Sequence, residues 1–275
     1  MEPKNQFTRT YRYKKYWPSY AYNIILLLLL RSMLKKTITF LFCSLVVSNA
    51  LMAQDKVTFL ASDKLIITAD AYVVNDTLPY IILCHDENSS RGEYKETAKK
   101  FTKLGYNSLA IDLRSGNVKF GEENETSIRA EAKKFPTGLL DTKADIEAAI
   151  NYAFTQSHKK VVLVGSGFSA SLALYLASSN PRVAGAMAFS PSDYFSGKLK
   201  TADAFPKCTK PVLVASAKSE AEAAKKYVSA IPSNNLTLFA PPNEGAHGSA
   251  ALYTSDTEYH AYWISILMFM RNVHP

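Results

Sequence analysis

Residues 161–177 read VVLVGSGFSASLALYLA, and this stretch decides the fold class. The run VVLV is β-branched and apolar without alternation, which is typical of a strand covered on both faces of a parallel sheet. A helical pattern begins at Phe168, after a turn of only three residues. A strand, a tight turn and a helix in this order indicate an α/β fold with a site at the carboxyl end of the strand.

The same alternation of strand and helix patterns continues on both sides of this stretch. The other strand-like runs are Ile66–Val74, Tyr80–Cys84, Ser108–Leu113, Val183–Phe189, Val212–Ala215 and Leu236–Phe239. The helical patterns are Glu93–Leu104, Leu139–Phe154, Phe168–Ser178, Glu220–Ile231 and Glu258–Val273. The alternation predicts one α/β domain over residues 54–275, with a mostly parallel central sheet and helices on both faces. The polar stretch Ser115–Thr137 is predicted to be a loop or an excursion above the sheet.

Composition excludes several classes of protein. The chain has 275 residues, of which 47% are hydrophobic and 20% charged, and this is an ordinary globular composition. The net charge of +8 comes almost entirely from residues 1–53, which hold eight of the 32 Lys/Arg and one of the 24 acids. The remaining 24 basic and 23 acidic residues nearly cancel, so the domain lacks the basic surface that nucleic-acid binding needs.

The N-terminal segment has the layout of a secretory signal peptide. Residues 33–53 consist of a start charged by Lys35 and Lys36, an apolar run, and small residues before a cleavage point after Ala53. We therefore expect export to the periplasm or the medium, with no stable membrane span in the mature chain. Residues 1–32 are interpreted as a non-native upstream extension or a basic and apolar leader. The alternative is a membrane anchor formed by an uncleaved leader.

The turn GSGFS, residues 165–169, has the position of a nucleophile elbow, the pattern G-x-S-x-G between a strand and a helix. The two residues that flank the centre must be small, and only a centre at Gly167 places small residues, Gly165 and Ser169, on both sides. Glycine adopts the positive φ of that position easily but offers no nucleophile. Ser166 and Ser169 are the candidate stand-ins, displaced from the centre along the chain.

Candidate acid and base residues follow later strands. Glu220 comes after the run VLVA, where a hydrolase triad keeps its acid. The alternative is that Glu220 only begins a helix capped by Ser219, and Asp193 is then the other candidate acid. His247 lies in a Gly-rich loop after the last strand, the expected place for a general base. No Cys or His spacing suggests a metal site, and we expect no cofactor.

These residues together resemble a known family. The stretches LCHDENSSRGEY, LAIDLRSG, VVLVGSGFSASLALYLA, LVASAKSE and EGAHGS resemble the α/β-hydrolase superfamily in order and spacing over about residues 57–273. The chain looks most like the lidless, dienelactone-hydrolase-like serine esterases, in their exported, Bacteroidetes-type form. The resemblance implies a carboxylic ester hydrolase without a separate lid domain.

The resemblance also implies a role for each matching residue. Glu220 falls on the acid, His247 on the base, and Gly167 on the nucleophile, where the family has a serine. The backbone N–H groups of Asp86 and Phe168 fall on the oxyanion hole. Small esters, lactones or acids are the ligands that this pocket implies.

Three hypotheses follow from the missing serine. The first is an ester hydrolase with an unusual nucleophile, or with water activated directly by His247 and Glu220. The second is a non-catalytic relative that binds a small molecule in the same pocket. The third is a surface interaction protein that uses the loop Ser115–Thr137. Loss of a triad serine costs on the order of 10⁶ in turnover, so we expect serine-dependent catalysis to be impaired.

Overall fold

The structure of the protein is a computed structural model that describes residues 27–28, 30–34, 54–195 and 197–275. Residues 54–275 lie within one compact unit, and residues 1–51 form a separate unit whose described part is helical. The predicted cleavage point after Ala53 and nearly all of the predicted leader therefore lie outside the described residues. Among the described helices, none is both long and apolar enough to cross a membrane.

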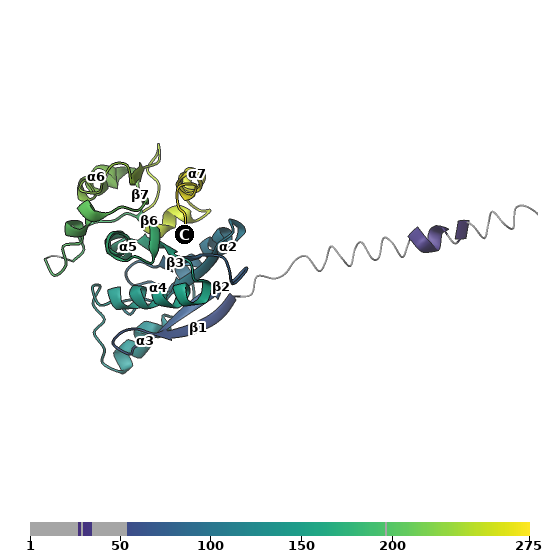
Figure 1. The fold of residues 1–275 in the computed structure, drawn as a ribbon, viewed down its shortest axis with the longest axis horizontal. Coiled ribbons are helices and arrows are strands. Elements are labelled where there is room, and N and C mark those ends of the chain that lie inside the picture. The colour runs from purple at the N-terminus through teal and green to yellow at the C-terminus, as the bar shows by residue number, and fades with distance from the viewer. Residues whose placement is uncertain (1–26, 29, 35–53, 196) are drawn as a thin grey trace, which may run out of the picture. The chain divides into compact units, whose positions relative to one another are not determined.

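An eight-stranded sheet forms the centre of the domain (Figure 1). The strands are β1 Gln54–Leu60, β2 Ile66–Tyr72, β3 Tyr80–Cys84, β4 Asn107–Ile111, β5 Val161–Ser166, β6 Val183–Phe189, β7 Val212–Ala215 and β8 Leu236–Phe239. Their order is β1-β2-β4-β3-β5-β6-β7-β8, with β2 antiparallel to both neighbours and the other pairs parallel. The predicted α/β class with a mostly parallel sheet is confirmed.

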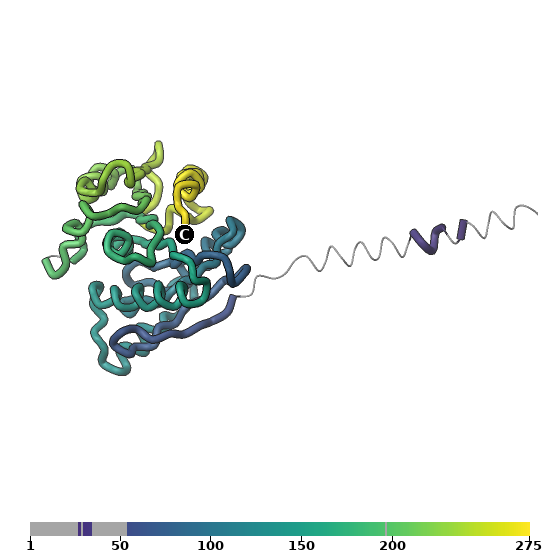
Figure 2. Tube along the Cα trace, viewed as in Figure 1, coloured from purple at the N-terminus to yellow at the C-terminus, as the bar shows by residue number. Residues whose placement is uncertain are grey.

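Helices cover both faces of this sheet because the central strands are apolar on both faces. In β3, Ile82 and Cys84 pack into one core layer and Ile81 and Leu83 into the other. The first layer is closed by α4 Lys143–Ser157, α5 Phe168–Ser179 and α6 Ala221–Tyr227, and the second by α2 Lys95–Lys103 and α7 Tyr259–Met270. No separate lid domain is present in residues 54–195 and 197–275. Figure 2 shows the chain path, with the β1–β2 hairpin and α6 at opposite ends of the domain.

Two elements differ from the sequence-based prediction. Strand β1 was not predicted, because it lies at the sheet edge and most of its side chains are exposed. The stretch Ser115–Thr137 is not a simple loop, since it contains α3, Glu125–Ala132. The Asn124 side chain caps this helix by accepting from the Ser127 amide at 2.8 Å. The helix is polar and buries little, so its hydrophobic pattern is weak.

Four short 3₁₀ helices complete the domain and carry several residues of the site. They are η1 Arg91–Tyr94, η2 Thr201–Lys207, η3 Lys218–Glu220 and η4 Gly248–Leu252. Three of them, η1, η3 and η4, lie in connections that begin at the carboxyl ends of β3, β7 and β8. Since parallel strands end at the same edge of a sheet, these turns gather their side chains at one place.

Candidate active site

The turn after β5 has the backbone of a nucleophile elbow. Gly167 joins β5 to α5 with φ of 55° and ψ of −118°, a conformation that glycine adopts without strain. A Cβ on Gly165 would lie 2.5 Å from the backbone nitrogen of Ala170, so the flanking position has no room for a larger residue. The elbow geometry is therefore present, and its centre carries no side chain.

The carboxylate of Asp86 occupies the space in front of Gly167. A Cβ built on Gly167 would lie 2.5 Å from Asp86 Oδ2 and closer still to Oδ1. The Asp86 side chain is held there by the Glu87 amide, which donates to Oδ1 at 2.7 Å, and by His247, whose Nε2 lies 3.4 Å from Oδ2. Burial raises the pKa of Asp86, but His247 and the Glu87 amide outweigh burial and hold this pKa below its ordinary value. An ionised carboxylate thus stands where a nucleophilic side chain at position 167 would begin.

His247 and Glu220 lie together as an acid–base pair. His247 Nδ1 is 2.6 Å from Glu220 Oε1, and the Ser190 hydroxyl donates to the other oxygen, Oε2, at 2.5 Å. Burial raises the pKa of Glu220, but the hydrogen bonds from Ser190 and His247 outweigh it and lower the pKa overall. Asp193, the other candidate acid, is exposed. Among the described residues, the carboxylates within ion-pair distance of the His247 ring are those of Glu220 and Asp86.

The position of His247 between two carboxylates changes its proton affinity. The hydrogen bond to Asp86 raises the pKa of His247, partial burial lowers it, and Glu220 raises it further, to about 9. At neutral pH the ring is therefore an imidazolium, which already carries the proton that a general base has to accept. The pair has the geometry of a hydrolase base and acid, but its charge state is that of an ion triplet with Asp86.

The two backbone donors expected for the oxyanion hole differ in their surroundings. The Asp86 N–H donates to Glu93 Oε2 at 3.1 Å, so this donor is engaged with a carboxylate, in contrast to the sequence-based expectation. The Phe168 N–H is the first amide of α5, where amides have no acceptor within the helix. A carboxylate beside the Asp86 amide would oppose the negative charge of a tetrahedral intermediate.

The candidate stand-ins Ser166 and Ser169 are buried structural residues. Ser169 Oγ donates to the Cys84 carbonyl at 2.7 Å and accepts from the Ser166 amide at 2.9 Å, which fastens the elbow to β3. Ser166 Oγ accepts from the Ser249 amide at 2.9 Å and lies 3.5 Å from Asp86 Oδ2. In the part of the chain that the structure describes, neither hydroxyl is hydrogen-bonded to His247.

His85 positions the turn after β3. Its Nε2 accepts from the Leu113 amide at 2.9 Å, so its Nδ1 carries the hydrogen and donates to the Asp86 carbonyl at 2.7 Å. Complete burial lowers the pKa of His85, which agrees with a neutral ring. This residue therefore fixes the backbone of Asp86 and has no proton to exchange at neutral pH.

Three residues that contact or surround the site were not predicted from the sequence. Glu93 was assigned only to a helix, although it reaches back to the Asp86 amide. Ser190 directly follows β6, and its position at the carboxyl end of a strand was a usable signal. Tyr194 lies near the site, since burial and the nearby carboxylates of Asp86 and Glu220 raise its pKa to about 12. Within the described residues, no cluster of three His, Cys, Asp or Glu side chains could hold a metal ion.

Comparisons with known proteins agree with this architecture. No curated protein matches the sequence significantly. Among solved structures, a Pyrococcus furiosus esterase is 16% identical, with 81% of this chain and 93% of that chain covered and a TM-score of 0.62. A dienelactone hydrolase from Anabaena variabilis is 15% identical, with 81% and 99% covered and a TM-score of 0.59. The esterase domain of a Rhodothermus marinus protein is 15% identical, with 81% and 100% covered and a TM-score of 0.57.

These structural similarities show that the domain has the α/β-hydrolase fold. A family model then narrows the assignment, because the one described as the dienelactone hydrolase family matches residues 68–235. That match spans more than half of the chain and includes β3 and β5 with the turns after them, which carry Asp86 and Gly167. The chain belongs to the dienelactone hydrolase family.

Proposed function

We propose that this protein is exported and binds a small molecule at the carboxyl edge of its sheet, without cleaving carboxylic esters through a covalent acyl intermediate. The observation that carries this proposal is the Asp86 carboxylate in front of Gly167. The elbow lacks a nucleophile, and the space that a nucleophile and its acyl carbon need is filled by a negative charge. The protein belongs to a hydrolase family, but this member has lost the acyl-transfer step.

The rest of the site supports the same conclusion. Loss of a triad serine costs on the order of 10⁶ in turnover. Direct activation of water would need a neutral imidazole, whereas the pKa of about 9 keeps His247 protonated at neutral pH. An oxyanion donor is worth about 10²–10³ in turnover, and the Asp86 amide is occupied by Glu93. These three features act on different steps of ester cleavage, and each opposes it.

Binding is favoured over a role for Ser115–Thr137 as a free interaction loop. Arg91 is buried and forms ion pairs with Glu122 and Glu125 of this segment. It also donates to the Glu123 carbonyl at 2.8 Å. The segment is thus fastened to the domain. Among the small molecules implied by the family, neutral esters and lactones fit better than acids, because carboxylates already surround the site.

Export is supported by the layout of residues 33–53 and by the position of the first strand. Cleavage after Ala53 would leave Gln54 as the first residue, and Gln54 is the first residue of β1, where it pairs with Tyr72. The whole sheet would therefore remain in the mature protein. N-terminal sequencing of protein recovered from the periplasm or medium tests this point, and a native leader retained on the cell-associated protein would contradict it.

Hydrolysis of short p-nitrophenyl esters tests the catalytic part of the proposal. We expect residues 54–275 and the matched His247→Ala variant to show the same rate, close to that of buffer. Ester cleavage by the native domain that is lost in His247→Ala would overturn the proposal, since the base would then be at work.

A further inference from the structure

Glu93 is a buried carboxylate without a cationic partner. The residue is only 4% exposed. Its two carboxylate oxygens accept hydrogen bonds from neutral groups, the Asp86 amide at 3.1 Å and the Ser249 hydroxyl. Over residues 54–195 and 197–275, no Lys, Arg or His lies within ion-pair distance of it. A buried carboxylate is costly unless a positive charge compensates it, so this position favours a cation.

Glu93 also lines a cavity of about 380 Å³ between the turn after β3 and η4. This volume lies in the range of roughly 300–1,000 Å³ that is typical of small-molecule sites. Leu252, Tyr253 and Phe120 form apolar and aromatic walls. The cavity therefore combines a carboxylate with surfaces that suit a flat apolar body.

Phe120 presents an exposed aromatic ring to this cavity. It lies with Gly121 at the tip of a two-residue hairpin turn between Lys119 and Glu122, which accounts for its φ of 49°, and the residue is 68% exposed. Its ring meets the Tyr253 ring edge-on, with centroids 5.5 Å apart. The two rings together give the cavity an aromatic wall that the core does not cover.

Two lysines and a glutamate lie at the outer part of the cavity. Lys95 is exposed and lines the cavity, and its charge has no carboxylate partner within the described residues. Lys100 also lines it, although its ammonium lies 4.0 Å from the centre of the Tyr259 ring. Glu96 is already paired with Lys99 at 2.9 Å. The cavity thus has an unpaired buried carboxylate and an unpaired exposed ammonium.

We infer that this cavity binds a small zwitterion with an apolar or aromatic body, whose ammonium group pairs with Glu93 and whose carboxylate faces Lys95. An aromatic ω-amino acid has these three parts in this order. The ammonium replaces the missing counter-charge of Glu93, the ring packs against Phe120 and Tyr253, and the carboxylate remains near solvent. The lining of this cavity includes none of Asp86, Gly167 and His247, so the inference goes beyond the proposed function and is independent of whether esters are bound or cleaved at the elbow.

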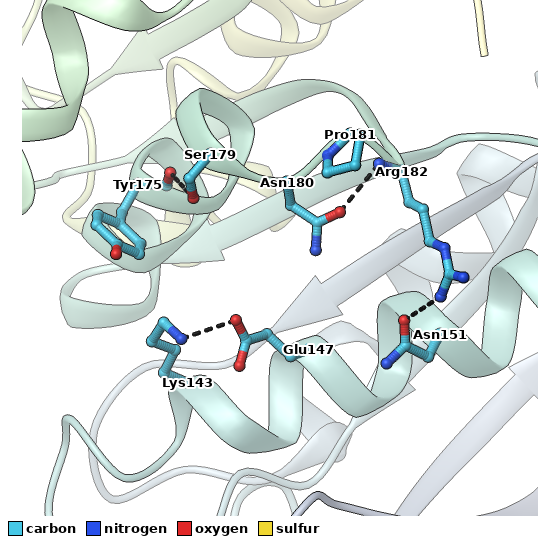
Figure 3. A pocket seen from close by; sticks show the side chains of 8 residues that line it. All are labelled: Lys143, Glu147, Asn151, Tyr175, Ser179, Asn180, Pro181 and Arg182. Atoms are coloured by element: carbon cyan, nitrogen blue, oxygen red, sulfur yellow. Dashed lines mark hydrogen bonds and ion pairs between the residues drawn. The ribbon is translucent and has the colours of Figure 1, made fainter.

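A second cavity differs from this one in the burial of its charges. A groove of about 530 Å³ lies between α4 and α5 (Figure 3). Lys143 pairs with Glu147 at 2.7 Å, and the exposed Arg182 donates to the Asn151 side chain. Among the residues that line this groove, no charged side chain is buried.

Calorimetry with three matched probes tests the inference. The probes are 4-(aminomethyl)benzoate, benzylamine and 4-methylbenzoate, which carry both charges, only the ammonium, and only the carboxylate. We expect 4-(aminomethyl)benzoate to bind most tightly. Glu93→Gln should weaken the two amines by about 10–100-fold, as expected for a lost charge-assisted hydrogen bond, and leave 4-methylbenzoate unchanged.

Further variants distinguish binding in the cavity from binding elsewhere on the protein. Lys95→Ala should weaken only the two carboxylates, by about 2–5-fold, because exposed ion pairs are weak. Phe120→Ala should weaken all three probes, and Lys159→Ala, at an exposed residue that does not line the cavity, should weaken none. If Glu93→Gln fails to fold, the order of the probes on the native protein and the Phe120→Ala result remain decisive. Equal binding of all probes, tightest binding of 4-methylbenzoate, or no binding at millimolar concentration would overturn the inference, whatever the ester assay shows.

Discussion

The turn after β5 and the turn after β3 meet at the same edge of the sheet, and they differ in what they contribute to the site. The β5 turn has the backbone of a nucleophile elbow, with φ of 55° at Gly167, but no side chain. The β3 turn supplies the Asp86 carboxylate, which fills the space that the elbow leaves empty. Elbow geometry alone therefore supplies no nucleophile, and the neighbouring turn fills the space in front of it.

The base and the acid, in contrast to the elbow, keep both of their side chains. His247 and Glu220 have the contact expected of a catalytic pair, 2.6 Å between Nδ1 and Oε1. With no nucleophile to serve, the same pair stabilises Asp86 as an ion triplet. An intact acid–base pair is therefore evidence for catalysis only where the group that it would activate has also been located.

The largest effect should come from restoring both turns at once. Asp86→Ala combined with Gly167→Ser removes the carboxylate and adds a hydroxyl at the elbow. We expect hydrolysis of short p-nitrophenyl esters to rise about 10²-fold over the native domain, part of the ~10⁶ that a complete triad provides. Gly167→Ser alone should remain silent, because its Cβ would collide with Asp86.

Two additional variants sharpen this result. His247→Ala in the double variant should abolish the gain, which shows that the base is used. Glu93→Ala in the double variant should raise the rate further, by up to ~10²–10³-fold, because the amide of residue 86 becomes available to an oxyanion. Activity in Gly167→Ser alone would mean that Asp86 moves freely and does not block the elbow.

Arg91→Met tests what holds the β3 turn in place. Arg91 is buried and bonds Asp112 at 2.5 Å and Asp70 at 3.1 Å, and both carboxylates are also buried. Removal of one partner of a buried ion pair leaves unpaired charge, so we expect a loss of about 3–5 kcal/mol in the free energy of unfolding. Urea denaturation followed by circular dichroism measures this loss.

Lys99→Ala is the matched control for Arg91→Met. Lys99 pairs with Glu96 at 2.9 Å on the exposed surface, and such pairs contribute about 0–1 kcal/mol. A loss for Arg91→Met that is no greater than for Lys99→Ala would show that the buried network does not hold the turn.

A double-mutant cycle on stability measures the contact between the two turns. Gly167→Ala places a Cβ against Asp86 and at a positive φ, and we expect a destabilisation of about 1–3 kcal/mol. In an Asp86→Ala background only the backbone strain remains, so the loss should shrink. Equal losses in the two backgrounds would contradict the close approach of residues 86 and 167, because contacting residues are expected to couple by ~0.5 kcal/mol or more.

The smallest effect is a pH dependence of stability. The folded pKa of His247, about 9, lies above the ordinary histidine value of 6.5, so protonation stabilises the folded state. The contribution is complete below about pH 6.5 and is lost as the pH rises through 9. Because the His247 side chain is half exposed, we predict a modest decline in Tm between pH 7 and 9.5, which His247→Gln should flatten. An identical decline in His247→Gln would assign it to other groups.

The sequence predicts much of this molecule because several signals agree. Seven of the eight strands and the order of turns follow from strand-like runs that need no tertiary information, such as Tyr80–Cys84 and Val183–Phe189. Gly167 could be placed at the elbow because only that frame has small residues on both sides. The place of Glu220 beside His247 could be anticipated because chain order and strand order are linked in a parallel sheet.

Other features depend on contacts that the sequence does not show. Asp86 was assigned to the oxyanion hole through its N–H, which required its carboxylate to point away, and nothing in the sequence says where this side chain points. Glu93 is hidden in a helical pattern, and its bond to the Asp86 amide joins residues seven apart around a turn. Strand β1 and helix α3 carry few buried side chains, so their patterns are weak.

Reaction with a fluorophosphonate, followed by intact mass and peptide mapping, shows whether the site holds an activated serine. The reagent modifies such a serine and does not depend on knowing the substrate. We predict no adduct on native residues 54–275 and one adduct at position 167 in the variant that combines Asp86→Ala with Gly167→Ser. An adduct on the native protein at Ser166 or Ser169 would contradict it, because a serine would then be activated beside an occupied elbow.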